Sequence, residues 1–247
     1  MSRQPTDGAG APARNAGERT PAAASRADID TFLGRAQAMA PVPGHSGSGR
    51  LVFALDATMS RQPTWDQARR LQADMFREAA AIGGLSIQVV YYRGLAECRA
   101  SSFVAQPQRL GALMSRIECR GGHTQIGKVL AHACRENDRA KVAALVFVGD
   151  AMEEDLDQLC VGAGALGLHG VAAFMFQEGY DPICERAFRE IARLTRGAYC
   201  HFAPGAADEL RELLRAAAAY AAGGMKALAD LKARNGSGAA RLIEQLK

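Results

Sequence analysis

Oxygen-bearing side chains stand shortly after two apolar runs and one glycine pair in this sequence. After the apolar run 50–55, an acid and two alcohols occupy every second position, so they would project from one side of an extended chain. A threonine comes soon after Gly121-Gly122, and a second acid follows the apolar run 142–148. Carboxylates and hydroxyls are hard oxygen ligands, the kind that Mg²⁺ or Mn²⁺ prefers. We therefore expect a metal site built from Asp56, Thr58, Ser60, Thr124 and Asp150.

Buried strands alternate with helices along the part of the chain that carries these residues. Apolar runs predict strands at 50–55, 86–92, 142–148, 171–176 and 198–202, with a shorter edge strand at 98–104. Apolar residues at helical spacing predict helices at 64–82, 107–117, 125–135, 155–166, 182–196 and 207–222. This order predicts an α/β fold, a doubly wound and mostly parallel sheet with helices on both faces. In such sheets ligands bind beyond the carboxyl ends of the strands, where Asp56 and Asp150 would lie.

The five residues resemble the metal-ion-dependent adhesion site of the von Willebrand factor type A domain family. Residues 56–60, Asp-Ala-Thr-Met-Ser, match the D-x-S-x-S motif of that family. Thr124 matches its threonine in a glycine-rich loop, and Asp150 matches its aspartate after a later strand. The resemblance implies the Rossmann-like fold of that family. The sequence departs from the pattern at Thr58, where serine is usual, and at Gly149, where threonine is often found.

This resemblance implies a protein-binding module and not an enzyme. Thr58 and Ser60 would contact the ion directly, and Thr124 would do so directly or through water. Asp56 and Asp150 would act mainly through bound water. A partner protein would supply an Asp or Glu carboxylate to the open coordination position.

Two other interpretations of the same residues stay open. Asp56 with Thr58, and Asp150 after a later strand, also resemble the haloacid dehalogenase-like phosphotransferases, in which the first aspartate attacks phosphorus. Position 58 lacks the second acid of that family, and no apolar strand between the two motifs ends in a Ser or Thr for the phosphate. The third interpretation is a type A scaffold without functional use of metal, because acids and alcohols after strands also cap helices and form turns.

Composition and charge limit the classes of partner. The formal net charge is only +4, and Lys and Arg do not cluster with aromatic residues, so we expect no nucleic-acid binding. No apolar stretch approaches the roughly 18 residues that a membrane helix needs, so we expect no membrane partner. With no secretory signal after Met1, we expect a cytoplasmic protein. None of the six cysteines stands in a CxxC pair, which argues against a cysteine metal site.

The sequence divides into four segments by composition. Residues 1–27 are rich in Ala, Gly, Pro, Ser and Arg and predict a disordered tail. Residues 28–49 predict a short amphipathic helix and a linker, and residues 50–222 carry the type A domain. Residues 223–247 predict a mobile helical tail, because a stretch of Asn, Gly and Ser splits two short helical pieces.

Overall fold

The computed structural model of the chain describes residues 49–62, 85–204, 206–234 and 236–246. Three predicted features fall outside these residues, wholly or in most of their length: the tail 1–27, the segment 28–49 and the helix 64–82.

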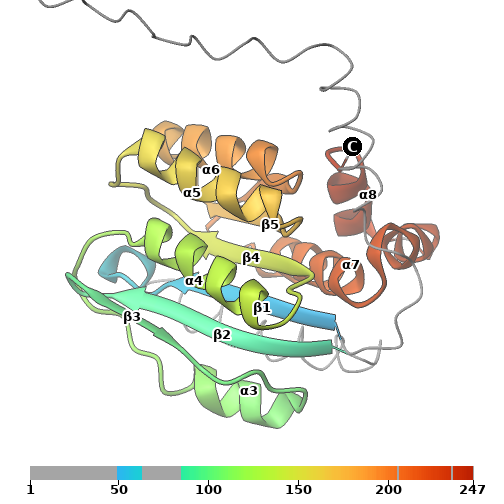
Figure 1. Cartoon of the computed structure of the whole chain (residues 1–247), viewed down its shortest axis with the longest axis horizontal. Helices are drawn as coiled ribbons and strands as arrows, with labels where there is room; N and C mark the ends of the chain where they lie inside the picture. Colours follow the sequence, from blue (N-terminus) through green and yellow to red (C-terminus); the bar gives the residue numbers. More distant parts are fainter. Residues whose placement is uncertain (1–48, 63–84, 205, 235, 247) are drawn as a thin grey trace, which may run out of the picture. The chain divides into compact units, whose positions relative to one another are not determined.

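The described residues form one six-stranded sheet with the strand order β3-β2-β1-β4-β5-β6 (Figure 1). All neighbouring strands are parallel except β3, which runs antiparallel to β2. The strands are β1 (Gly49–Asp56), β2 (Leu85–Arg93), β3 (Glu97–Ala100), β4 (Ala144–Gly149), β5 (Ala172–Glu178) and β6 (Ala198–Phe202). The chain therefore extends the sheet first to one side of β1 and then to the other, as the doubly wound prediction requires.

The central strands are apolar because both of their faces are covered. Every residue of β4 and β5 is buried, and β1 is buried from Leu51 onward. Continuous apolar runs of this kind are typical of parallel strands between two helical layers. β3 is shorter and more exposed, as the predicted edge strand was expected to be.

Helices cover both faces of the sheet (Figure 1). On one face lie α4 (Ile126–Arg139), α5 (Leu156–Leu168) and α6 (Pro182–Leu194), and on the other lie α3 (Pro107–Met114) and α7 (Ala207–Ala233). The predicted start of α6 is confirmed, because Asp181 accepts a hydrogen bond from the amide of Cys184 and Pro182 opens the helix. Among the described helices, none has both the length and the apolar character needed to cross a lipid bilayer.

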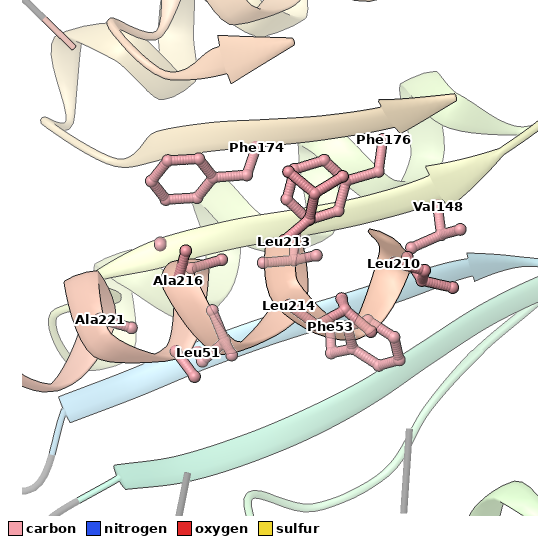
Figure 2. Close-up of a cluster of buried hydrophobic side chains, with 14 of the residues drawn as sticks. Leu51, Phe53, Val148, Phe174, Phe176, Leu210, Leu213, Leu214, Ala216 and Ala221 are labelled. Atoms are coloured by element: carbon pink, nitrogen blue, oxygen red, sulfur yellow. The ribbon is translucent and has the colours of Figure 1, made fainter. Parts of the chain in front are cut away.

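One apolar face of α7 packs across three strands (Figure 2). The helix contributes leucines and alanines, and the strands contribute leucine, valine and phenylalanine side chains. Those labelled in Figure 2 are Leu210, Leu213, Leu214, Ala216 and Ala221 of α7 with Leu51, Phe53, Val148, Phe174 and Phe176 of the strands. This layer fixes the strands whose carboxyl ends carry the predicted metal ligands.

The residues after Ala222, for which the sequence predicts a mobile tail, pack against the domain in the structure. α7 bends at Gly223 and Gly224 and continues, and a further helix, α8 (Ser237–Ile243), follows. Leu228 and Leu242 are completely buried in the same apolar cluster as α7. The side-chain amide of Gln245 donates to the carbonyl of Tyr199 (2.7 Å) and accepts from its amide (2.8 Å). Apolar side chains spaced along short helices therefore dock this segment on the sheet.

Candidate metal centre

The candidate centre lies where the strand order of the sheet reverses. β1 has β2 on one side and β4 on the other, and all three end at the same edge. Asp56 ends β1, and Asp150 directly follows β4. The carboxyl ends of strands at such a reversal form the usual crevice for ligands in open α/β sheets. The fold thus brings these two acids to one place.

The loop after β1 brings its acid and two alcohols together. Asp56 is fully buried, and its Oδ1 accepts a hydrogen bond from the amide of Thr58 (2.8 Å). The short 3-10 helix η1 (Met59–Arg61) follows, and the Oγ1 of Thr58 lies 3.1 Å from the Oγ of Ser60. Neighbouring ligands in an octahedral Mg²⁺ shell, with bonds of about 2.1 Å, lie about 3 Å apart. The two hydroxyls are therefore spaced as adjacent ligands of one ion would be.

Tyr92 of β2 holds the second oxygen of Asp56. Its hydroxyl donates to Oδ2 at 2.9 Å, and its ring stacks on Phe147 of β4 at a centroid distance of 6.1 Å. Burial, and after it the nearby Asp56 carboxylate, raise the pKa of Tyr92 well above its usual value, so the phenol remains a donor. The ligand pattern in the sequence does not include Tyr92. Its position opposite Asp56 in the strand register is the signal that identifies this contact.

Asp150 places a second carboxylate beside the first. Its Oδ1 is buried and has no hydrogen-bond partner within the part of the chain that the structure describes. Burial raises the pKa of Asp56, and the charge of Asp150 raises it further, although hydrogen bonds from Thr58 and Tyr92 lower it. Asp56 and Asp150 stand at the ends of neighbouring strands, and one of them has an unpaired buried oxygen, so a cation would stabilise this pair of acids.

Gly149 leaves no room for the threonine that the family pattern often has there. A Cβ at this position would lie 2.8 Å from a ring carbon of Phe147 and 3.4 Å from the Cβ of Asp56. The Phe147 ring, which also contacts Tyr92 and Phe188, occupies that space. The sequence therefore has glycine where the family often has threonine because the Phe147 ring fills the space of a side chain at position 149.

The loop that carries Thr124 lies beside the loop after β1. The amide of Arg120 donates to the carbonyl of Ala57 (3.0 Å), and the loop then passes so close to Gly94 that a Cβ on Gly122 would lie 2.0 Å from its carbonyl oxygen. Only glycine fits at position 122. This close approach positions the residues that follow, including Thr124, next to the turn between β2 and β3.

Glu153 joins Thr124 to the loop of Asp150. The Oγ1 of Thr124 accepts from the amide of Glu153 (2.9 Å), and the amide of Thr124 donates to the Glu153 carboxylate (3.0 Å). A hydroxyl oxygen has two lone pairs, so Oγ1 keeps one for a metal ion. The structure therefore brings Thr124 to the loop of Asp150 through this pair of bonds.

Three further charged residues near the centre have structural partners. Glu154 and Asp155 cap two different helices, and Arg61 forms an ion pair with a residue of β5. The carboxylate of Glu154 accepts from the amides of Ile126 and Gly127 at the start of α4, whereas Asp155 caps α5. Arg61 is 1% exposed and forms an ion pair with Glu178 at the end of β5. The partners of Glu154 and Arg61 lie far away along the chain, so local sequence patterns do not reveal these two contacts.

The donor set of the centre is dominated by hydroxyls. Among the residues that the structure describes, no three His, Cys, Asp or Glu side chains are grouped as metal ligands. A hard divalent cation nevertheless fits the two carboxylates and the hydroxyls of Thr58 and Ser60. The spacing of the two hydroxyls and the unpaired oxygen of Asp150 are the reasons.

Known proteins match this chain in structure and not in sequence. Neither models of known protein families nor curated protein sequences gave a match. A von Willebrand factor type A protein from Catenulispora acidiphila aligns with a TM-score of 0.57 and 19% identity, over 70% of this chain and 43% of its own. The SpRpn10 VWA domain aligns with a TM-score of 0.54 and 10% identity, over 66% of this chain and 94% of its own.

A pilus adhesin gives a third match. SpaC from Lactobacillus rhamnosus GG, in its open conformation, aligns with a TM-score of 0.55 and 9% identity, over 72% of this chain and 30% of its own. The present chain thus spans less than half the length of the Catenulispora protein and of SpaC. At these identities the similarity establishes the fold: the chain has the fold of the von Willebrand factor type A domains.

Proposed function

We propose that this chain is a protein-binding module that captures a carboxylate of a partner protein through Mg²⁺ or Mn²⁺. The ion would be held by Asp56, Thr58, Ser60, Thr124 and Asp150. The observation that carries the proposal is the buried Oδ1 of Asp150, which lacks a hydrogen-bond partner among the described residues and lies close to the buried Asp56.

The chemistry of the donors supports binding of a further acid. A fully buried carboxylate beside a second, partly buried one is unfavourable unless a cation compensates their charge. The remaining donors are neutral hydroxyls, which supply geometry without further negative charge. A divalent cation bound there would keep positive character and an open coordination position for a carboxylate of the partner.

The geometry of Asp56 favours binding over phosphoryl transfer. Both of its oxygens accept hydrogen bonds, and the side chain is fully buried. A nucleophilic carboxylate has to come into direct contact with the phosphorus atom of a substrate, and a side chain without exposed surface that is held from two directions is poorly placed for that. In this proposal Asp56 instead orients the ligand shell, and the chain carries out no catalytic step. One structural neighbour is itself described as a pilus adhesin, which agrees with use of this fold in binding.

Calorimetry with Mg²⁺ and Mn²⁺ tests the metal site. We expect Thr58→Val, which keeps the shape of the side chain, and Asp150→Asn each to weaken ion binding at least about tenfold. The matched control is Ser115→Ala, which removes a hydroxyl at the end of α3. Asp56→Ala is less informative, because it would also leave the buried Tyr92 hydroxyl without its hydrogen-bond acceptor and so destabilise the fold.

Acetate added to the buffer stands in for the carboxylate of the partner. If the folded wild-type chain binds neither ion, with or without acetate, the proposal is wrong and the scaffold interpretation takes its place. Ion binding by Thr58→Val and Asp150→Asn at wild-type strength would also contradict it, and phosphatase assays would then test the enzyme interpretation.

A further inference from the structure

Exposed apolar side chains gather at the edge of the sheet that carries the candidate centre. Seven large apolar side chains are exposed among the described residues, and four of them follow the carboxyl ends of parallel strands. These four, which we call the apolar rim, are Met59, Leu95, Tyr180 and Ile183. Exposed apolar groups that converge on one site are typical of an interaction surface, whereas scattered single ones are not.

The rim flanks the centre on both sides. Leu95 lies in the turn after β2, and Met59 lies between the two hydroxyl ligands Thr58 and Ser60. Tyr180 and Ile183 follow β5, on the far side of β4. The strand order therefore places Leu95 and Met59 on one side of the two acids and Tyr180 with Ile183 on the other.

Contacts support the position of the rim residues. The ring of Tyr180 lies 5.3 Å from the ring of His201. Leu95 follows Gly94, whose carbonyl accepts from the amide of His123 (3.3 Å). The turn that carries Leu95 thus packs against the loop that carries Thr124, and Tyr180 packs beside His201 of β6 at the end of β5.

We propose that the partner segment is an extended peptide in which large apolar side chains stand two residues before and two residues after the captured Asp or Glu. This inference rests on the proposed function. Strands lie about 4.8 Å apart, so the ends of β2 and β5, three spacings apart, are separated by about 14 Å. In an extended peptide, the residue two positions before a central residue and the residue two positions after it lie about 13–14 Å apart. Their side chains point to the same side of the peptide as the side chain of the central residue. The carboxylate would reach the ion while both apolar side chains meet the rim.

Peptide titrations followed by amide NMR spectra of the full chain test this inference. The probe is Gly-Leu-Ser-Glu-Ser-Leu-Gly, with Gly-Ser-Ser-Glu-Ser-Ser-Gly lacking the apolar side chains and Gly-Leu-Ser-Gln-Ser-Leu-Gly lacking the carboxylate. Each is titrated in Mg²⁺ and in chelator. We expect the leucine peptide to bind in Mg²⁺ roughly tenfold or more tightly than the serine peptide, and the glutamine peptide to lose binding.

Protein variants locate the preference. Leu95→Ser and Tyr180→Ser should each reduce the advantage of the leucine peptide several-fold while Mg²⁺-dependent binding of the serine peptide stays unchanged. Leu168→Ser is the matched control, because Leu168 is as exposed as Leu95 (79%) but ends α5, before β5 begins. It should change nothing.

The outcomes separate this inference from the function on which it rests. Two outcomes would contradict the role of the apolar rim but not the metal-bridged function. In the first, both glutamate peptides bind with equal strength in Mg²⁺. In the second, the leucine peptide keeps its advantage in Leu95→Ser and Tyr180→Ser. Absence of any Mg²⁺-dependent binding would contradict both the role of the rim and the metal-bridged function.

Discussion

At the scale of single residues, the candidate centre depends on side chains that are themselves held in place. Asp56 is fixed from two directions, by the amide of Thr58 and by the hydroxyl of Tyr92. Tyr92 is fixed in turn by Phe147. A ligand shell is set up in advance when its members cannot rotate away, which lowers the cost of binding an ion.

Tyr92→Phe isolates this contribution. The change keeps the ring on Phe147 but removes the donor to Asp56, so we expect a loss of about 1–2 kcal/mol in the free energy of unfolding and weaker ion binding. The control is Tyr199→Phe, which removes another buried hydroxyl, the donor to Gln177 (2.8 Å). Urea unfolding should show similar losses for both variants, while calorimetry should show weaker ion binding for Tyr92→Phe alone. Equal ion affinities would show that the phenol has only a structural role.

At the scale of elements, the sequence predicts the described strands of the sheet and the helices that cover it, apart from the helix 64–82, which lies outside the described residues. β4 and β5 follow from continuous apolar runs, and the start of α6 follows from an aspartate and a proline, because these signals are local. The five predicted ligands likewise lie at or soon after strand ends, or in the loop before α4.

Contacts between those loops could not be predicted from local signals. Glu153 and Glu154 are neighbours with two different roles, one on Thr124 and one on the start of α4. Arg61 reaches Glu178 across the end of β4. Each partner is far away in the sequence, so its identity depends on how closely the folded loops approach, which periodicity does not reveal.

Glu154→Ala tests whether the loop after β4 supports α4. Its carboxylate accepts from the amide of Gly127 (2.9 Å) and from that of Ile126, and both lose their acceptor in the variant. We expect a loss of about 1–2 kcal/mol in the free energy of unfolding. Asp157→Ala, an exposed acid in the first turn of α5, should change it by less than about 0.5 kcal/mol in the same urea titrations. Similar values for the two variants would contradict the bridging role.

At the scale of the whole molecule, the segment after Ala222 differs most from its sequence-based expectation. Glycines and short helical pieces predicted a mobile tail, because each piece alone is too short to be a stable helix. In the structure, Leu228 and Leu242 are completely buried against the domain. Tertiary packing stabilises these helices, and their own sequence does not reveal what surface they meet.

Leu242→Ala distinguishes a docked helix from a mobile tail. Truncating a fully buried leucine should cost about 2–5 kcal/mol in the free energy of unfolding of the whole domain. Glu244→Ala, at an exposed position two residues later, serves as the control and should have little effect. Unfolding curves for Leu242→Ala that coincide with wild type would contradict the packing of α8.

The contact between Gln245 and Tyr199 also has a consequence for self-association. Because the side-chain amide occupies both outward backbone groups of Tyr199, a strand from another molecule cannot pair with β6 at that residue. The opposite edge strand, β3, has only four residues and carries the charged pair Glu97 and Arg99. Short, charged or covered edges discourage the growth of fibrous aggregates. Such a domain can expose apolar side chains at the ends of its strands and still resist polymerisation through its sheet.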